Sequence, residues 1–278
     1  MKNVLITGAN SYIGTNLEDW LARFPGQYKV STLDLKNDSW KEHDFTIYDS
    51  IFHVAGIAHI KETEENKDLY FKVNKDLTVN VAKKAKESGI KQFVFLSSMS
   101  VYGVKEGVIS KSTIPAPNTS YGVSKLVAER ELEKLSDNSF KVSVLRPPMV
   151  YGKGCKGNYQ TLRKLALTLP LFPIVKNKRS MIYIGNLCEF VRTLIDNESD
   201  GIFCPQNKEY VNTSNMVKSI AQLNNKKIYY SRLLVPLVSL ARLVNIVPAQ
   251  KAFGNLIYEK DDLVDTFSFE ESMIRTEQ

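Results

Sequence analysis

Tyr121 and Lys125 lie four residues apart in the stretch "SYGVSK", inside a segment whose pattern predicts a helix. On a helix this spacing places both side chains on the same face. A neighbouring ammonium group favours the phenolate and thereby lowers the pKa of a tyrosine. Such a tyrosine can exchange a proton with a substrate hydroxyl while hydride passes to or from a nicotinamide. Many helices carry this spacing by chance, so the pair needs support from its surroundings.

That support comes from the apolar run "FVFLSSMSVYG", which ends in hydroxyl residues about twenty positions before Tyr121. The run predicts a buried strand. Ser98, at its end, can hydrogen-bond the same substrate oxygen as Tyr121. The three residues Ser98, Tyr121 and Lys125 are therefore the candidate catalytic residues.

A possible phosphate-binding loop lies at the start of the chain, in "VLITGANSYIG" from Val4 to Gly14. In a dinucleotide-binding loop the first glycine makes a tight turn and the last lets a helix pack closely on the strand. Gly8 and Gly14 supply these two ends, but Ser11 replaces the middle glycine. By itself the motif supports a nucleotide site and an ordinary strand–turn–helix equally.

Asp34 favours the nucleotide site because it ends the second predicted strand, 20 residues beyond Gly14. An acidic residue at this place hydrogen-bonds the ribose hydroxyls of the adenosine. Its negative charge would repel a 2′-phosphate, so it favours NAD over NADP. The alternative is a solvated acid at a strand end.

The elements that position these residues alternate along the first 150 or so positions. Apolar runs typical of strands occupy 3–8, 28–34, 48–56, 91–98 and 141–152, and amphipathic helical patterns occupy 13–24, 68–89 and 119–135. This alternation predicts an α/β fold with a doubly wound parallel sheet. After Gly152 the alternation is lost, which predicts a smaller C-terminal α/β subdomain that binds substrate. The expected domains are 1–152 and 153–278, with an approximate boundary and interleaved subdomains.

Composition excludes several classes of function. The 37 Lys and Arg residues are dispersed among 30 acids, so the net charge of +7 fits attraction to an anionic small molecule at least as well as to nucleic acid, and we expect no nucleic-acid partner. Three separated cysteines, Cys155, Cys188 and Cys204, indicate reduced thiols and a cytoplasmic location. We expect Cys155 to face solvent.

The histidines give no metal site, because no acid at ligand spacing accompanies His43, His53 or His59. We expect His53 to be a hydrogen-bonded core residue. The apolar segment 232–248 is interrupted by two arginines, two prolines and an asparagine, so no membrane span is predicted. We expect a partly buried helix there rather than membrane association.

Six motifs occur in order: "TGANSYIG", "FHVAG", "FLSSMSVYG", "YGVSK", "LRPPMVYGKG" and "RSMIYIGNL". In this combination the chain resembles the extended short-chain dehydrogenase/reductase family, in its nucleotide-sugar epimerase/dehydratase branch, whose type enzyme is UDP-glucose 4-epimerase. The resemblance runs over essentially the whole chain. It implies a Rossmann-type sheet, tightly bound NAD and a UDP-sugar substrate.

The resemblance also assigns roles by position. It implies that Ser98, Tyr121 and Lys125 are catalytic, with Lys125 also holding the nicotinamide ribose, and that Arg179 binds the nucleotide diphosphate as a bidentate guanidinium can. Asn158, in a loop rich in Lys and Gly, is a further candidate for substrate contact. The cofactor residues that the resemblance implies are Gly8, Ser11, Tyr12, Ile13 and Gly14 at the pyrophosphate, Asp34 at the ribose, Asp44 and Phe45 at the adenine, Val54, Ala55, Gly56 and Asn74 along the cofactor, and Pro148 at the nicotinamide.

The chain departs from the family in three places. Met149 stands where many sugar-nucleotide epimerases have an asparagine, the stretch between Asp34 and Phe52 is short, and the C-terminal part is compact. Dehydratases carry an Asp-Glu pair where this chain has Met99 and Ser100, so elimination of water is not expected.

The expected activity is inversion at C4 of a UDP-hexose or UDP-N-acetylhexosamine through a 4-keto intermediate. The alternatives are an NAD(P)H-dependent 4-ketoreductase of a UDP-deoxysugar and, from a different class, a non-catalytic NAD(P)-sensing regulator. Family members often dimerise, so a homodimer is a further expectation.

Overall fold

Two compact units make up the chain in this computed structural model, which describes residues 1–58, 62–244, 250 and 252–278. The first unit contains Met1–Gly103, Ile114–Pro147 and Leu187–Pro205, and the second contains Val104–Thr113, Pro148–Asn186 and Gln206–Gln278. Each unit is therefore assembled from segments that alternate along the sequence.

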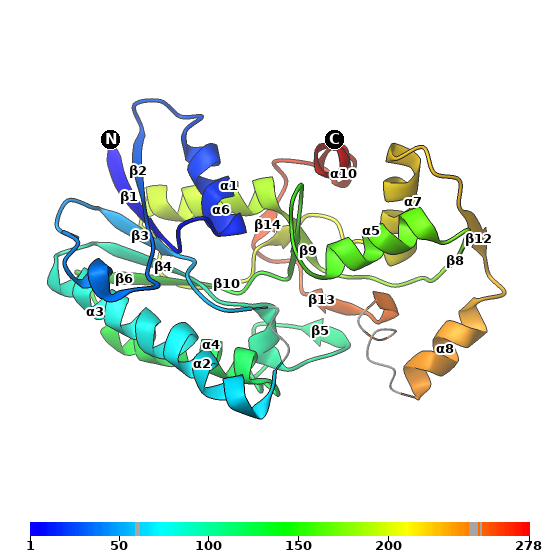
Figure 1. Ribbon diagram of the computed structural model, residues 1–278, viewed down its shortest axis with the longest axis horizontal. Coiled ribbons are helices and arrows are strands. Elements are labelled where there is room, and N and C mark those ends of the chain that lie inside the picture. Colours follow the sequence, from blue (N-terminus) through cyan, green and yellow to red (C-terminus); the bar gives the residue numbers. More distant parts are fainter. Residues whose placement is uncertain (59–61, 245–249, 251) are drawn as a thin grey trace. The chain divides into compact units, whose positions relative to one another are not determined.

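The first unit is built on a six-stranded parallel sheet with the strand order β10-β6-β4-β3-β1-β2 (Figure 1). The strands are β1 (Lys2–Thr7), β2 (Tyr28–Leu33), β3 (Ser50–His53), β4 (Gln92–Leu96), β6 (Lys141–Leu145) and β10 (Gly201–Phe203). This confirms the predicted doubly wound, Rossmann-type α/β fold; β10 was not predicted. Because β2 and β3 lie on opposite sides of β1, the carboxyl ends of β1 and β3 form a switch point, where such sheets bind ligands.

Helices cover both faces of this sheet (Figure 1). On one face lie α2 (Lys67–Phe71), α3 (Thr78–Glu87) and α4 (Ser120–Leu135), and on the other lie α1 (Tyr12–Leu21) and α6 (Ile184–Asn197). The helix predicted over 68–89 is interrupted by a π-helical segment, η3 (Lys72–Leu77), between α2 and α3. Short 3₁₀ turns complete the unit: η1 (Asp38–Lys41), η2 (Glu64–Asn66) and η4 (Met99–Tyr102).

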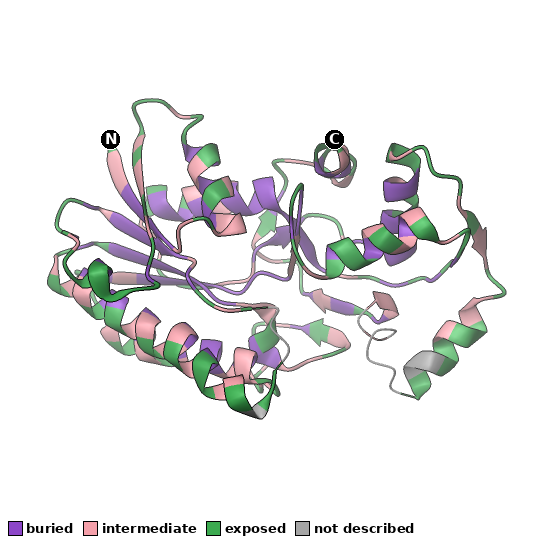
Figure 2. Cartoon of the chain, in the orientation of Figure 1, coloured by how far each residue is buried: buried purple, intermediate pink, exposed green. Residues whose placement is uncertain are grey.

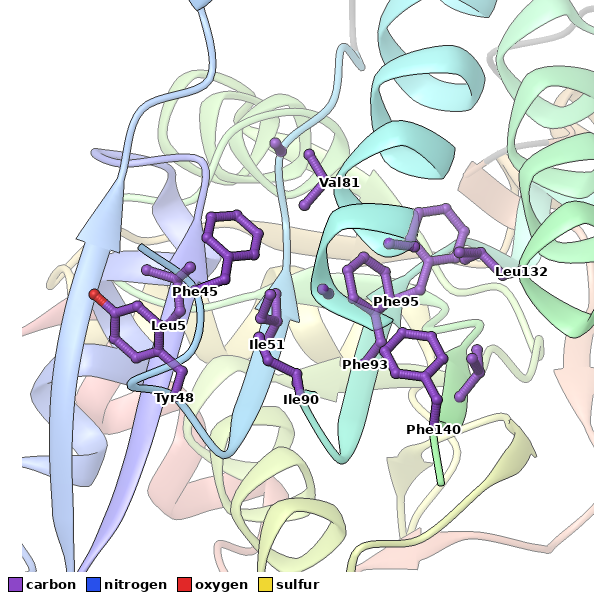
Figure 3. Close-up of a cluster of buried hydrophobic side chains, with 14 of the residues drawn as sticks. Leu5, Phe45, Tyr48, Ile51, Val81, Ile90, Phe93, Phe95, Leu132 and Phe140 are labelled. Carbon is purple, nitrogen blue, oxygen red and sulfur yellow. The ribbon is translucent and has the colours of Figure 1, made fainter. Parts of the chain in front are cut away.

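The core between the sheet and α3 and α4 is formed by large apolar side chains (Figure 3). Ile51, Phe93 and Phe95 project from the strands, and Val81 and Leu132 come from α3 and α4. All five are fully buried. Every residue of β3 and β4 is buried, as expected for central strands covered on both faces. This packing fixes the strands whose carboxyl ends carry the candidate site described below.

The strand predicted over 141–152 is wrong in its extent. The chain leaves the central sheet after Leu145, and β7 (Met149–Tyr151) pairs instead with β9 (Met181–Tyr183) in the second unit. The two prolines between them, Pro147 and Pro148, lack the backbone N–H that a central strand needs.

The second unit contains helices and short parallel strand pairs. Its helices are α5 (Asn158–Thr168), α7 (Thr213–Leu223), α8 (Val235–Leu243) and α10 (Phe269–Glu277). Besides β7 and β9, the paired strands are β5 (Gly107–Ile109) with β13 (Leu256–Tyr258), β8 (Leu171–Pro173) with β12 (Tyr229–Ser231), and β11 (Gln206–Asn207) with β14 (Leu263–Val264). Across the described ranges, we find no helix with the length and apolarity needed to cross a bilayer.

Candidate active site

Two glycines at the loop after β1 stand where a side chain would meet neighbouring atoms. Gly8 has φ +98°, and a Cβ there would lie 2.8 Å from the backbone N of Ala55. A Cβ on Gly14 would lie 3.1 Å from Ile6 Cγ2 and 3.2 Å from Val54 Cγ1. The two glycines therefore allow the first turn of α1 to approach the ends of β1 and β3.

Ser11, the residue in place of the middle glycine, caps α1. Its Oγ accepts a hydrogen bond from the backbone N of Gly14 at 3.2 Å. Tyr12 and Ile13 form the start of the helix, whose first turn contains no acid. A helix N-terminus without nearby acids favours a bound anion. Asn10 has a left-handed φ of 63°, a feature of this turn that the glycine pattern did not reveal.

Asp34 lies just after β2 with its side chain 48% exposed. Its Oδ1 accepts a hydrogen bond from the backbone N of Lys36 at 2.9 Å, and its Oδ2 lies 3.7 Å from Lys36 Nζ. An ion pair this exposed is weak, so it can be exchanged for ribose hydroxyls.

The residues predicted near the adenine differ in accessibility. Asp44 is exposed, and its Oδ1 accepts hydrogen bonds from the N and Oγ1 of Thr46, which lower the pKa of Asp44. Phe45 belongs to the buried core, with Lys84 Nζ 4.9 Å from its ring centroid. The ring of Phe45 is therefore not offered to a ligand, which leaves its backbone for any contact.

Asn74 holds the chain segment that follows β3. It is fully buried in η3, and its Oδ1 accepts a hydrogen bond from the N of Ile57 at 2.8 Å. Its Nδ2 donates to the Ile57 carbonyl at 3.1 Å and to Ser124 Oγ at 3.2 Å. A Cβ on Gly56 would lie 2.9 Å from Asn74 Oδ1 and 3.2 Å from Lys125 Nζ. Val54, Ala55 and Gly56 thus follow a path fixed by Asn74 and next to Lys125.

Ser98 and Tyr121 are brought together by two capped turns. Ser98 caps η4, and Thr119 caps α4. A Cβ on Gly122 would lie 2.7 Å from the Ser100 carbonyl, so the start of α4 lies directly against η4. A hydrogen bond between the side chains of Ser98 and Tyr121 lowers the pKa of Tyr121.

The expected effect of Lys125 on Tyr121 is wrong for this structure. Burial raises the pKa of Tyr121 by more than the Ser98 hydrogen bond lowers it, and the tyrosine Tyr70, whose ring lies edge-on at 6.4 Å, raises it further. Lys125 Nζ instead donates to the Leu96 carbonyl at 2.8 Å and lies 4.6 Å from the Phe95 ring. The ammonium is therefore engaged with the strand end rather than with the phenol.

Lys125 is itself strongly perturbed. Burial lowers its pKa to about 8, and the negative charge of Glu129, one turn further along α4, opposes this shift. Arg146 Nη2 binds Glu129 Oε2 at 2.5 Å, and Arg146 Nη1 donates to Tyr102 OH at 2.9 Å. Ser97 Oγ also donates to Glu129.

This buried network of Ser97, Tyr102, Glu129 and Arg146 was not predicted. The one signal for it in the sequence is the four-residue spacing from Lys125 to Glu129.

His53 is a hydrogen-bonded core residue, as predicted. Its Nδ1 lies 2.8 Å from Thr7 Oγ1 and its Nε2 lies 3.0 Å from Thr78 Oγ1. Burial and then the charge of Lys125 lower its pKa to about 3, so the ring is neutral.

Within the described ranges no cluster of His, Cys, Asp and Glu could hold a metal ion; His59 lies outside them. Cys155 is buried rather than facing solvent; its backbone hydrogen-bonds Gly152 and the side chain of Gln160, and burial raises the pKa of its thiol.

Three predicted residues belong to the second unit. Pro148 is buried just before β7, and Asn158 is exposed at the start of α5. The backbone of Arg179 pairs with Val211, and its Nη1 donates to the Gly254 carbonyl at 3.1 Å. Burial lowers the pKa of Arg179, and the charge of Glu106 opposes this.

Comparison with known proteins decides the family. The sequence model of the NAD dependent epimerase/dehydratase family matches residues 4–203. This chain belongs to that family. It is 32% identical to the UDP-glucose 4-epimerase of Vibrio cholerae, a match that covers 95% of this chain and 84% of that protein. It is 26% identical to the N-acetyl-alpha-D-glucosaminyl-diphospho-ditrans,octacis-undecaprenol 4-epimerase of Escherichia coli, over 84% of this chain and 76% of that protein.

Solved structures agree on the fold. The UDP-glucuronic acid 4-epimerase of Bacillus cereus superposes with a TM-score of 0.75 at 17% identity, covering 98% of this chain and 96% of that one. Membership of the epimerase/dehydratase family makes the chain an NAD-dependent enzyme, an epimerase or a related sugar-nucleotide oxidoreductase.

The first unit of this epimerase/dehydratase chain fits NAD. At Gly8, Gly14 and Gly56 a Cβ would meet atoms of this chain, so the absence of side chains lets the loop, the first turn of α1 and the segment after β3 pack closely together, as in a dinucleotide-binding loop. Asp34 offers an exposed carboxylate at the end of the adjacent strand. These are the steric and polar features that a dinucleotide requires.

Proposed function

We propose that the protein is an NAD-dependent 4-epimerase that acts on a UDP-hexose or UDP-N-acetylhexosamine through a 4-keto intermediate. The observation that carries this proposal is the hydrogen bond between Ser98 and Tyr121, one helical turn from a buried lysine. The similarity to two 4-epimerases of diphosphate-linked sugars supports it.

Bound NAD would supply the hydride acceptor, and in its reduced form the hydride donor, for C4 of the sugar. Gly8, Ser11, Tyr12, Ile13 and Gly14 would hold its pyrophosphate and Asp34 its adenosine ribose, with Lys125 at the other ribose. The remaining cofactor residues would be Asp44 and Phe45 at the adenine, Val54, Ala55, Gly56 and Asn74 along the cofactor, and Pro148 at the nicotinamide.

Tyr121 is the proposed proton acceptor for the C4 hydroxyl of the sugar. Burial raises its pKa, which disfavours the phenolate that the proposed proton transfer needs. Ser98 donates to the same substrate oxygen and orients it. Lys125, with a pKa of about 8, lies next to Gly56, and its proposed role is to hold the nicotinamide ribose from the end of β4, where its Nζ donates to the Leu96 carbonyl.

In the second unit, Arg179 is the proposed ligand of the substrate diphosphate. The residue is partly buried, and among the hydrogen bonds described Gly254 occupies one donor of its guanidinium. Asn158, at the exposed start of α5, is a proposed substrate contact. Cytoplasmic location and homodimerisation remain predictions.

The Tyr121→Phe variant tests the proposed chemistry. Without the phenol oxygen the proton transfer is lost, so kcat should fall by roughly 10²–10⁴-fold while NAD affinity is retained. The measurement is interconversion of UDP-glucose and UDP-galactose, and of their N-acetylated forms, together with NAD titration. Tyr28→Phe, which removes a surface hydroxyl bonded to Asp196, is the control.

An unchanged kcat in Tyr121→Phe would exclude this tyrosine as the base. Mass spectrometry of the small molecules released on denaturation distinguishes the epimerase from the ketoreductase. Stoichiometric NAD with a fraction of NADH fits an enzyme that recycles its cofactor in place. No retained cofactor and tighter binding of NADPH would favour the ketoreductase.

A further inference from the structure

One side of α8 presents a stripe of exposed apolar side chains. Leu233, Leu237, Leu240 and Val244 follow each other at intervals of four, three and four residues, which places them along one side of a helix. Each is between 56% and 86% exposed. We call these four residues the leucine face.

The opposite side of α8 is the one directed toward the protein. Leu234, Val235 and Val238 are partly buried. The other described residues of α8 are exposed, and none of the described ones is fully buried (Figure 2). None of the described helices or strands packs extensively on α8. A surface helix normally turns its polar side to solvent. α8 has apolar side chains on both sides, and those of the leucine face are the more exposed, which marks an interaction surface.

The sequence segment that contains this helix has charges of a single sign. Residues 210–258 contain six Lys and Arg residues and no Asp or Glu, so this segment carries most of the net charge of +7. Lys226, Lys227 and Arg232 are exposed, and they form no ion pair with any described residue. With Lys218 and the tyrosines Tyr229 and Tyr230, the lysines line a hollow of about 350 Å³ between α7 and β12.

Because the side chains of the leucine face are exposed rather than partly buried as the sequence led us to expect, we propose that this face and the cations that precede it in the chain bind the surface of an anionic lipid bilayer. A short apolar helix can lie in the interface with its exposed side chains in the acyl boundary, while cations that precede it in the chain lie among the head groups. Tyrosines are typical of the same depth. At nine residues α8 is far too short to span the bilayer, so the contact is peripheral. The proposal does not depend on which sugar the enzyme uses.

The same charges disfavour a second copy of this chain as the occupant. A two-fold interface brings a surface patch against itself. Lys226, Lys227 and Arg232 would then face like charges, and the segment 210–258 has no acid to pair with them. Anionic head groups supply the missing negative charge.

Flotation of the purified full-length protein with lipid vesicles tests this proposal. We expect binding to phosphatidylcholine vesicles that contain phosphatidylglycerol and weaker binding to phosphatidylcholine alone. Leu237→Glu/Leu240→Glu should weaken binding about tenfold or more. Two leucines that would insert into the bilayer are replaced by negative charges, which the acyl region and the anionic head groups both disfavour. Lys226→Glu/Lys227→Glu, which leaves the helix intact, should abolish the preference for the anionic lipid.

The matched control is Val108→Glu/Ile114→Glu, which adds the same charge at side chains 56% and 83% exposed elsewhere on the chain. It should bind vesicles as the wild type does. The proposal is overturned if the wild type fails to float with anionic vesicles, or if the control loses binding equally. It is also overturned if sedimentation velocity shows self-association that Leu237→Glu/Leu240→Glu abolishes.

Discussion

Lys125 and Glu129 lie one turn apart on α4, and both are buried. Burial disfavours the charge of Lys125, while the carboxylate of Glu129 favours it. Glu129 is in turn bound by Arg146. In the proposed reaction Glu129 would therefore act through Lys125, as a positioning residue whose negative charge favours the charged form of the buried ammonium.

Glu129→Gln should have two separate effects. It leaves the guanidinium of Arg146 buried without its partner, which should lower the free energy of unfolding by about 3–5 kcal/mol. It also removes the charge that raises the pKa of Lys125, so the alkaline limb of the pH profile of kcat should move to lower pH. The control Glu131→Gln removes an exposed acid of the same helix that pairs with Lys134. A variant that loses stability but keeps the wild-type pH profile would show Glu129 to be purely structural.

His53 makes stability depend on pH in the acid range. Its pKa is about 3 in the folded protein and 6.5 when exposed, so only the unfolded chain takes up a proton between these values. Stability is therefore lost as the pH falls below 6.5. From pH 7 to pH 5 this residue should cost about 2 kcal/mol.

Denaturant unfolding of wild type and His53→Gln at both pH values measures that cost. The glutamine does not titrate, so the difference between the two proteins should shrink by the stated amount at pH 5. A constant difference would contradict the assignment.

Candidate site residues that lie close to one another in the sequence could be predicted from it. Tyr121 and Lys125 share one turn, and Gly8 and Gly14 flank one loop. The partners that decide their electrostatics come from other segments: Leu96 holds Lys125, and Arg146 holds Glu129. Because such pairs form through tertiary packing, the pattern of residues on one helix does not reveal them.

At the scale of elements, η3 is the least expected feature. A continuous helix was predicted over 68–89, whereas the chain adopts π geometry at Lys72–Leu77 with Asn74 buried inside it. Apolar periodicity does not distinguish a π segment from an α-helix of that length. The amide of Asn74 uses both its donor and its acceptor on Ile57, so η3 and the segment after β3 are coupled.

Asn74→Asp should weaken NAD binding about tenfold through this coupling, because it removes the donor to the Ile57 carbonyl and to Ser124 Oγ and buries a charge in its place. Isothermal titration with NAD measures the effect. Asn80→Asp, at an exposed position on α3, is the control and should bind NAD as the wild type does. If the wild type, Asn74→Asp and Asn80→Asp bind NAD with equal affinity, Asn74 has no part in cofactor binding.

At the scale of the whole molecule, the first unit is completed by a distant segment. The edge strand β10 pairs with β6, and the buried amide of Gln92 donates to the carbonyls of Leu194 and Ser199. Trp20 also donates to Glu189. β10 has only three residues, two of them exposed, so neither its length nor its apolarity indicates a strand.

A fragment of residues 1–152 should therefore fail to unfold cooperatively, although its length matches the predicted nucleotide-binding domain. It leaves the edge of β6 open and the amide of Gln92 without its acceptors. Adding a peptide of residues 187–205 should restore a cooperative transition, measured by circular dichroism on heating. Cooperative unfolding of the fragment alone, at the midpoint of the full chain, would refute this dependence.

The late position of β10 also has a consequence on the ribosome. The ribosome finishes β6 well before Gly201–Phe203 leaves the exit tunnel, with the intervening part of the second unit made in between. At roughly 5–20 residues per second this leaves the nascent sheet without its last strand for several seconds. During that interval β6 presents an unpaired backbone edge to neighbouring chains. A chaperone that shields nascent strands should therefore raise the yield of this enzyme. The gain should be larger than for a protein whose sheet strands are all close together in the sequence.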